Sequence, residues 1–275
     1  VVLTAACAGE AGLPDPAGLP AAEGPRLLVI GDWGAGSEAQ DRLGEAMAIF
    51  AGSGPINAIV TTGDNFYDDD EDALMEPMDW ATEADIPLWI TWGNHDIESE
   101  ERIEVINDVF DDPPRWTVRR WGPIEVVLLD STQISNRGQL AFLEKQMTGS
   151  TRPAILAFHH PPWSCGAYLS TPGIIDEWLP LFDEDVFLVL SGHDHNYQRF
   201  VTDEANYVIT GGGGQALNEI RQCERGLPEN VEAEATHHFV VLELIDSNVV
   251  LTAYRSDLSV IEQVELPIEY WDGPR

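Results

Sequence analysis

Five short polar segments, each directly after a short apolar run, constrain this chain more than any other feature of its sequence. The apolar runs are rich in β-branched and aromatic residues and are bounded by Gly, Pro or Asp, which favours strands over buried helices. The five apolar runs are residues 27–30, 58–62, 88–92, 154–157 and 186–190. The polar segments that follow them are, in the same order, residues 31–34, 63–67, 93–96, 158–160 and 192–195. Loops that leave the carboxyl ends of strands in an open α/β sheet gather along one edge, so we expect these segments to meet in one cleft.

The rest of the pattern predicts an α/β chain with two sheets. Ser37 and Gln40 form a capping-box pattern before a run of helical periodicity that stops at Gly52, so the chain opens with a strand, a turn and a helix. Beyond residue 200 the pattern changes to strands and turns, which favours two sheets over one. Further strands are expected at 124–129, 207–210, 239–245, 249–254 and 260–266, and further helices at 139–147 and at 174–182 with a break at Pro180.

With 275 residues, 44% of them hydrophobic, the chain is long enough to bury a substantial core. We predict one domain at 26–270, because the five segments run from residue 31 to 195 without a break. Residues 1–25 are predicted to hold a flexible tether rich in Ala, Gly and Pro. The sequence has no run of about 18 apolar residues, so it predicts no membrane-spanning helix.

Acidic side chains dominate the composition, with 48 Asp and Glu against 14 Lys and Arg and a net charge of −34. We therefore expect no nucleic-acid partner, because binding a phosphate backbone requires Lys and Arg. A small phosphate anion would also be repelled unless metal ions supply local positive charge. The acidic run 68–72 lacks the glycine that a calcium-binding EF-hand loop requires, so we interpret it as a solvated loop.

The three cysteines leave two questions open. Residues 1–7 end in small residues and Cys7 and resemble a bacterial lipoprotein processing site, although Thr4 stands where that site usually has Leu. The resemblance implies an exported protein of the bacterial periplasm or cell envelope, attached to the membrane through a lipidated Cys7; an ordinary N-terminus with an incidental cysteine is the alternative. Cys165 and Cys223 then favour a disulfide, whereas a reducing cytosol would keep two free thiols.

The residue types in the five segments are those that hold metal ions. Asp32 and Asp64 are short carboxylates, and a pair of ions needs at least one carboxylate that can bridge them. Asn94 is an unusual ligand, and His95 beside it would reach the substrate. A lone Gly-Asp after a strand carries little weight, because Asp is common in turns.

Five of the seven histidines lie inside the segments, and we interpret the other two, His237 and His238, as structural. His193 and His195 are two residues apart, where an extended chain would point both rings to one side. The joint pattern of carboxylates, amide and imidazoles predicts metal ligation at the expected sheet edge.

In order and spacing, the five segments resemble the calcineurin-like metallophosphoesterases. Because Tyr67 stands three residues after Asp64, the second segment resembles that of the purple acid phosphatase branch, especially its small tartrate-resistant type. The resemblance covers residues 26–255 and implies a four-layer α/β/β/α sandwich with two mixed sheets and two metal ions. The implied ligands of one ion, ferric in that branch, are Asp32, Tyr67 and His195; those of the second, divalent ion (Fe, Zn or Mn) are Asn94, His159 and His193, and Asp64 bridges the two.

The resemblance also implies an activity, the hydrolysis of phosphate monoesters by a hydroxide that the two metal ions hold. His95 would protonate the leaving oxygen or stabilise its charge. Together with His95, the residues expected to contact a small phosphoester substrate are Asn94, His160 and Tyr168.

Tyr168 is a departure from that family, many of whose members have a histidine there, nine residues after the ligand aligned with His159. His160 would either substitute for the missing histidine or stack on Trp163. Asp96 would either orient the neighbouring His95 or stabilise the turn.

Two alternatives to a phosphomonoesterase remain. One is a phosphodiesterase or nucleotide hydrolase of the same superfamily, which a direct comparison of diester and monoester substrates would reveal. The other is an exported lipoprotein that binds metals or a ligand without turnover. The sequence predicts no oligomeric state.

Overall fold

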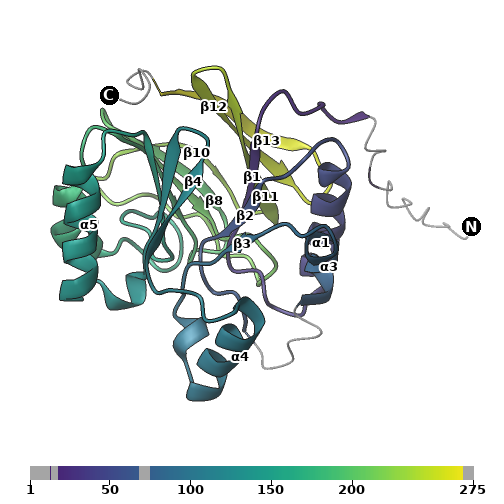
Figure 1. Ribbon diagram of the computed structural model, residues 1–275, viewed down its shortest axis with the longest axis horizontal. Coiled ribbons are helices and arrows are strands. Elements are labelled where there is room, and N and C mark those ends of the chain that lie inside the picture. The colour runs from purple at the N-terminus through teal and green to yellow at the C-terminus, as the bar shows by residue number, and fades with distance from the viewer. Residues whose placement is uncertain (1–12, 14–17, 68–74, 269–275) are drawn as a thin grey trace, which may run out of the picture.

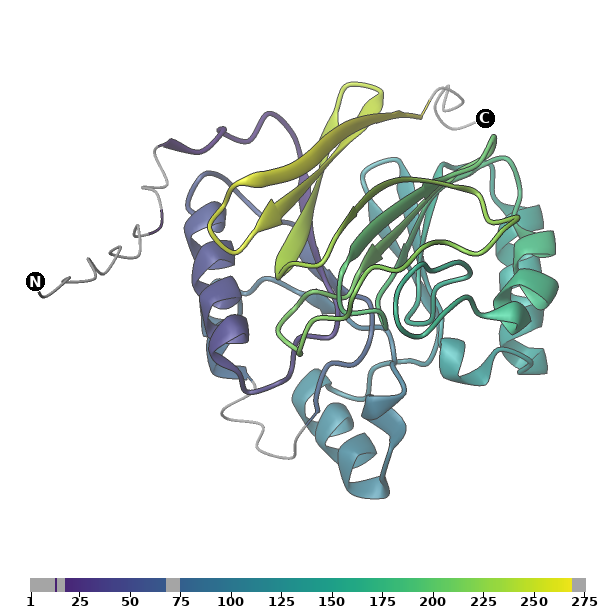
Figure 2. The ribbon, with the colours of Figure 1, turned by 180° about the vertical axis from the view of Figure 1, so that it is seen from behind.

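The computed structural model describes residue 13 and residues 18–67 and 75–268. Two β-sheets pack face to face, with helices on the outer side of each (Figures 1 and 2). One sheet has six strands in the order β13-β12-β11-β1-β2-β3, and the other has seven in the order β10-β8-β9-β7-β6-β5-β4. The predicted α/β fold with two mixed sheets is confirmed.

The six-stranded sheet joins the two ends of the domain. β1 (Arg26–Ile30) pairs in parallel with β2 (Ala58–Thr61), and β2 with β3 (Leu88–Trp89). On its other side β1 pairs antiparallel with β11 (His238–Ile245), which forms successive hairpins with β12 (Asn248–Arg255) and β13 (Val260–Pro267). The hairpins of the second half therefore complete the sheet that the first strands begin.

The seven-stranded sheet has a parallel centre formed by β5 (Ile124–Leu128), β6 (Ala154–Ala157), β7 (Val186–Ser191) and β9 (Asn206–Thr210). Antiparallel strands extend it: β4 (Thr117–Trp121) at one edge, and β8 (Tyr197–Val201) and β10 (Glu229–Glu234) at the other. The sequence pattern missed these three. β4 and β10 are edge strands whose charged side chains hide the strand signal.

Alternation along the strands separates the layers. Leu27 and Val29 point into the core between the two sheets, whereas Leu28 and Ile30 pack beneath the helices of the six-stranded sheet. A third apolar cluster fills the space between the seven-stranded sheet and its own helices. These three cores correspond to a four-layer α/β/β/α sandwich.

Helices cover both outer faces. α1 (Glu38–Ala51) and α3 (Asp79–Glu83) flank the six-stranded sheet, and α5 (Arg137–Gly149) and α6 (Pro172–Glu177) flank the seven-stranded one (Figure 1). α4 (Glu100–Phe110) projects at the bottom of the view. Single turns of 3-10 helix are η2 (Glu76–Met78), η3 (His95–Ile97), η4 (Ser131–Gln133) and η5 (Leu179–Leu181).

One expected helix is broken as predicted, and one expected strand is shorter than predicted. The helix expected at 174–182 divides at Trp178 into α6 and η5, because Pro180 has no N–H and its ring clashes with a carbonyl one turn earlier. The strand expected at 88–92 pairs only as far as Trp89. Beyond it the Thr91 carbonyl accepts a hydrogen bond from the Asn65 side chain instead of a neighbouring strand.

Cys165 and Cys223 form a disulfide. Cys7 and the acidic run 68–72 lie outside the described residues. Within the part of the chain that the structure describes, none of the helices has the length and apolar character needed to cross a membrane.

Candidate metal centre

The predicted ligands meet at one edge of the two sheets. Asp32, Asp64 and Asn94 follow β1, β2 and β3, while His159 follows β6 and His193 follows β7. The six-stranded sheet thus supplies the oxygen donors and the seven-stranded sheet supplies the imidazoles. Close contacts between these distant segments show that they meet, as the strand-end rule predicts.

Glycines before the ligands permit this close approach. A Cβ on Gly93 would lie 2.1 Å from the Asp64 backbone nitrogen, and one on Gly192 would lie 2.4 Å from Asp32 Oδ2. No side chain fits at either position without moving a predicted ligand. The Gly-Asn and Gly-His spacing in the sequence therefore reflects packing at the site itself.

Three predicted ligands have left-handed backbone conformations. The φ angles are 57° at Asp32, 49° at Asp64 and 71° at His193. Such conformations cost free energy for non-glycine residues and concentrate at functional sites. The φ of His193 also shows that the interpretation of residues 193–195 as extended chain was wrong, and the rings of His193 and His195 enter different parts of the cluster.

Four side chains form what we call the tyrosine set, Asp32, Asp64, Tyr67 and His195. The Tyr67 hydroxyl lies 3.0 Å from Asp32 Oδ1, 3.0 Å from Asp64 Oδ2 and 3.2 Å from His195 Nε2. His195 Nε2 is also 3.4 Å from Asp32 Oδ1. The set presents two carboxylates, a phenol and an imidazole to one point.

Four side chains form the imidazole set, Asp64, Asn94, His159 and His193. His159 Nε2 lies 3.2 Å from Asp64 Oδ2, 3.1 Å from Asn94 Oδ1 and 3.2 Å from His193 Nδ1. Asp64 belongs to both sets, and it is the carboxylate that the sequence predicts as the bridge.

Backbone groups fix the orientation of the carboxylates. Asp32 Oδ2 accepts a hydrogen bond from the His193 N–H at 2.9 Å, and Asp64 Oδ1 accepts one from the His95 N–H at 2.8 Å. In each case one carboxylate oxygen is held while the other faces the cluster.

Backbone carbonyls orient two of the histidines in the same way. His159 Nδ1 lies 2.9 Å from the Thr62 carbonyl oxygen, and His195 Nδ1 lies 2.8 Å from that of Ala216. A carbonyl accepts a hydrogen bond, so Nδ1 carries the proton in both rings and Nε2 is directed at the cluster. Outer hydrogen bonds of this kind hold metal-binding histidines in place.

The electrostatics of the cluster favour a bound cation. Burial lowers the pKa of His159, but the neighbouring Asp64 and Asp32 outweigh it and raise this pKa to about 9. Burial and the same two carboxylates raise the pKa of Tyr67 above its usual value. Carboxylates that stabilise positive charge on an imidazole this strongly would also stabilise a metal ion.

Two histidines are kept neutral. Burial, with His159 nearby, lowers the pKa of His193 to about 2 and that of His160 to about 3. A neutral ring retains the nitrogen lone pair that binds a metal ion. The ring nitrogens of His159, His160 and His193 lie close enough to hold one ion, as do donor atoms of Asp32, Asp64 and His159.

His95 lies at the open side of the cluster, with its ring centroid 4.5 Å from that of Tyr67. Its side chain is 36% exposed, and its Nδ1 lies 3.2 Å from Glu98 Oε2. Glu98 was not predicted to contact His95, although residues three apart on a helical turn are neighbours and this spacing indicates such a contact. The open question about Asp96 is answered by its bonds, since its buried carboxylate accepts from the Asn65 and Gly93 N–H groups and so holds the turn.

His160 packs against the rings of His159 and His193 rather than on Trp163, so the stacking interpretation was wrong. Its Nδ1 lies 2.9 Å from Ser131 Oγ, which also accepts a hydrogen bond from the His160 N–H. Ser131 was not predicted. It follows β5, so the strand-end rule that found the other segments would have found it.

Tyr168 is 52% exposed at the rim, with its ring centroid 4.5 Å from that of His193. Its position depends on Asp194, a buried carboxylate that accepts from the Ala167 N–H at 2.7 Å, from the Tyr168 N–H at 3.2 Å and from the Ser164 hydroxyl. Asp194 lies between the two predicted ligands of the fifth segment, and this role was not predicted.

The calcineurin-like phosphoesterase family model matches residues 25–197, more than half of the chain and the part that contains every predicted ligand. The chain belongs to the calcineurin-like phosphoesterases. The family comprises dinuclear metal enzymes, and the cluster in this phosphoesterase brings together carboxylates and imidazoles that could hold a metal ion.

Known proteins resemble this chain in sequence or in fold. Purple acid phosphatase 7 of Arabidopsis thaliana is 26% identical over 228 residues, which cover 68% of this chain and 69% of that protein. A probable cyclic nucleotide phosphodiesterase of Synechococcus sp. is 30% identical over 149 residues, 50% of this chain and 57% of the relative. The solved structure of GAP50, described as the anchor in the inner membrane complex of Plasmodium, superposes with a TM-score of 0.75 at 19% identity and covers 89% of both chains.

The donors of this phosphoesterase suit a pair of hard or borderline ions. Carboxylate, phenol and amide oxygens are hard ligands, and imidazole binds iron and zinc. Eight donor groups converge there, namely those of Asp32, Asp64, Tyr67, Asn94, His159, His160, His193 and His195. The residues present therefore fit the metals that the family implies.

Proposed function

We propose that the cluster is a two-metal centre that hydrolyses phosphate monoesters. The observation that carries the proposal is the division of the donors into two sets that share Asp64. The tyrosine set would hold a ferric ion, because two carboxylates and the phenolate that Tyr67 becomes on losing its proton are hard anionic donors, and the imidazole set would hold a divalent ion such as Fe, Zn or Mn.

Bound at these sets, the ions would neutralise charge on the phosphoryl oxygens and make a water molecule acidic enough to attack phosphorus near neutral pH. The protein's own contribution is to orient the donors from both sheets and to exclude bulk water, since Asp32, Asp64 and His159 are 0 to 1% exposed. Because the chain carries a net charge of −34, a phosphate anion would approach only where such local positive charge exists.

His95 supports hydrolysis by its position. Glu98 contacts its Nδ1, which leaves Nε2 as the ring nitrogen available to a substrate at the open side of the cluster. We assign His95 the donation of a proton to the leaving oxygen. Asn94, His160 and Tyr168, which contact His159 or His193 in the same cluster, are assigned as substrate contacts.

The second candidate function is hydrolysis of phosphodiesters. It is favoured by the 30% identity to a probable cyclic nucleotide phosphodiesterase. Tyr168 is relevant to this alternative, because a phenol replaces the histidine expected in purple acid phosphatases and changes which proton donors surround the leaving group.

We also propose that the protein is exported. The disulfide between Cys165 and Cys223 supports this, because disulfides persist in oxidising compartments and are rare in a reducing cytosol. Membrane attachment through Cys7 would follow from the lipoprotein resemblance of residues 1–7 and is tested by metabolic labelling with a radioactive fatty acid.

The deciding experiment compares p-nitrophenyl phosphate with bis(p-nitrophenyl) phosphate, using the full chain supplied with iron plus zinc or manganese from acid to alkaline pH. We expect faster hydrolysis of the monoester and loss of activity on chelation. Faster hydrolysis of the diester would establish the second candidate. If elemental analysis finds both metals bound and neither ester is hydrolysed, the protein binds without turnover.

A further inference from the structure

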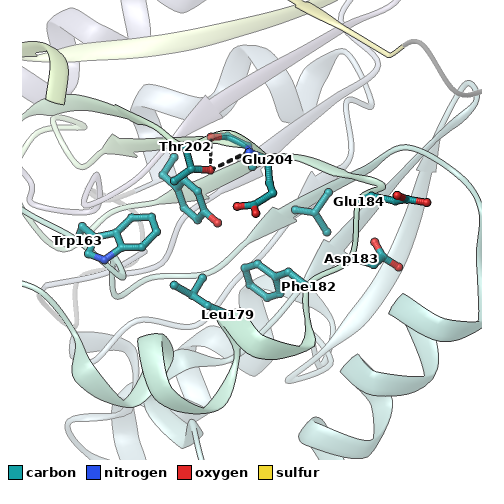
Figure 3. Close-up of a pocket in the computed structure, with 10 residues that line it drawn as sticks. Trp163, Leu179, Phe182, Asp183, Glu184, Thr202 and Glu204 are labelled. Atoms are coloured by element: carbon teal, nitrogen blue, oxygen red, sulfur yellow. Dashed lines mark hydrogen bonds between the residues drawn. The ribbon is translucent and has the colours of Figure 1, made fainter. Parts of the chain in front are cut away.

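A cavity lies away from the metal centre, beside the seven-stranded sheet. It has a volume of about 560 Å³ and opens between η5, the start of β7 and the turn that joins β8 to β9 (Figure 3). Val186 lines it at the first residue of β7, whereas the metal centre follows the last, Ser191. Each strand residue advances about 3.3 Å, so the two ends of β7 are about 16 Å apart. The cavity shares no lining residue with the two donor sets.

Aromatic side chains form much of the wall. Trp163, Phe182 and Tyr207 line the cavity, and the rings of Trp163 and Tyr207 meet at 4.6 Å in an edge-to-face arrangement. Figure 3 shows Trp163 at one end, with Phe182 facing the middle of the cavity. Faces of aromatic rings attract cations through the ring quadrupole.

The charged residues of the wall all carry the same sign. Asp183, Glu184 and Glu204 are acidic, and the ten residues that line the cavity include no Lys, Arg or His. Glu204 lies above Phe182 and Asp183 in Figure 3. Burial raises the pKa of Tyr207 to about 12, and the charge of Glu204 adds to the rise, which places this carboxylate near the phenol.

Tyr207 adds a polar group to this wall. The residue is 8% exposed and lines the cavity. Its hydroxyl oxygen is not one of the buried polar atoms that lack a partner among the described residues, so solvent reaches it from the cavity. The hydroxyl can therefore pair with a polar group of a ligand there.

We propose that this cavity binds a small organic cation with an alkylated ammonium group. Its methyl or methylene groups would pack on Trp163 and Phe182, its charge would be balanced by Glu204, and a polar substituent would pair with the Tyr207 hydroxyl. A metal ion would make no use of the aromatic wall, and a neutral apolar ligand would gain nothing from the carboxylates.

The probe is choline, compared with 3,3-dimethyl-1-butanol, the neutral alcohol in which carbon replaces the charged nitrogen. Isothermal titration calorimetry with the metal-loaded full chain should show saturable binding of choline, with the alcohol at least about 10-fold weaker. Added salt should weaken choline binding. Equal affinity for the two molecules, or no binding of choline at millimolar concentration, would overturn the proposal.

Substitutions locate the binding site. Glu204→Gln should weaken choline binding by about 5-fold or more, and Phe182→Leu by about 3-fold or more. The matched control is Glu144→Gln, which removes one exposed charge on α5 outside the cavity and should change the affinity by less than about 2-fold. Tyr168→Ala tests the metal cleft, and a loss of choline binding in that variant would place the cation there and refute the cavity site. Glu204 lies in an exposed turn, so its substitution is compatible with folding even if Phe182→Leu is not.

Discussion

The two sheets contribute different chemistry to one site, and each depends on the other to hold it. The six-stranded sheet provides Asp32 and Asp64, and the seven-stranded sheet provides His159 and His193. Yet Asp32 is oriented by the N–H of His193, and His159 by the carbonyl of Thr62, a residue that follows β2. The metal centre therefore forms only when both sheets are folded and packed together.

The oxygen donors of one sheet and the nitrogen donors of the other should respond differently to substitution. The carboxylates carry the charge that a cation requires, so their loss removes the reason for a metal to bind. The imidazoles add geometry and lone pairs to a site whose charge is already set. We expect the largest effects on the side of the six-stranded sheet.

Replacing Asp64, the residue that both donor sets share, should have the largest effect. Asp64→Asn keeps the shape and tolerates the φ of 49°, so it removes charge without the backbone strain that Asp64→Ala adds. We expect loss of at least one metal ion per chain in elemental analysis and a fall in kcat of at least about 10³-fold. Asp41→Asn on the exposed face of α1 is the matched control. Normal turnover in Asp64→Asn would refute the bridging assignment.

Replacing His95 should separate proton transfer from metal binding. His95→Ala is expected to keep both metals and to lower kcat by about 10²-fold, because general acid catalysis contributes on that scale. Glu98→Gln should cause a smaller loss of about 3-fold, since the ring would lose orientation and not identity. Measured kcat with leaving groups of increasing acidity should show the His95→Ala defect shrinking. A uniform defect across leaving groups would move the acid role to another residue.

The sequence predicted which side chains would meet at the cluster, because strand ends are local features. A short apolar run followed by Gly and a polar residue identifies both the strand and the side chain at its carboxyl end, as at Asp32 and Asp64. The same local signal does not show which loops are held by buried bonds. Asp194 supports the Tyr168 loop through bonds to residues about 30 positions away, and no pattern in its own segment reveals them.

The backbone conformation of single residues was the other feature that the sequence did not predict. An extended chain at residues 193–195 was the simplest expectation, and the left-handed φ of His193 contradicts it. Short-range spacing gives the side chains of a strand, but a turn that packs against Asp32 is set by tertiary contact. The edge strands β4 and β10 were missed for a related reason, because their exposed charged residues are placed by the neighbouring strand and not by an apolar pattern.

His238 sharpens the contrast between histidines of the two sheets. It begins β11 in the six-stranded sheet, is fully buried, and packs against the Tyr197 ring, with Nδ1 2.9 Å from the Thr236 carbonyl oxygen. Burial lowers its pKa from 6.5 to about 4. Protons therefore bind the unfolded chain more tightly, so this residue's contribution to stability is complete above pH 6.5 and declines as the pH falls toward 4.

The expected measurement is the free energy of unfolding in urea at pH 7 and at pH 5. The wild-type chain should lose about 2 kcal/mol more over this interval than His238→Gln does, because the glutamine does not titrate. His237→Gln is the matched control at the neighbouring, partly exposed position. Identical pH dependence in the wild type and His238→Gln would show that the imidazole becomes protonated in the folded state without cost.

Replacing Tyr67 should have the smallest effect, and it tests whether all oxygen donors contribute equally to metal binding. Tyr67 contacts Asp32, Asp64 and His195, but it is a neutral phenol. Its own burial and the charge of the two neighbouring carboxylates raise its pKa. A metal ion must displace the phenol proton to gain this ligand, so Tyr67 contributes less than a residue that is already anionic. Tyr67→Phe should therefore keep the metal of the imidazole set, weaken the metal of the tyrosine set, and lower kcat/KM by about 10-fold. Metal content measured against chelator concentration should show one ion lost earlier than in the wild type. If both ions are lost together, the two sets form one cooperative centre and the division between them does not hold.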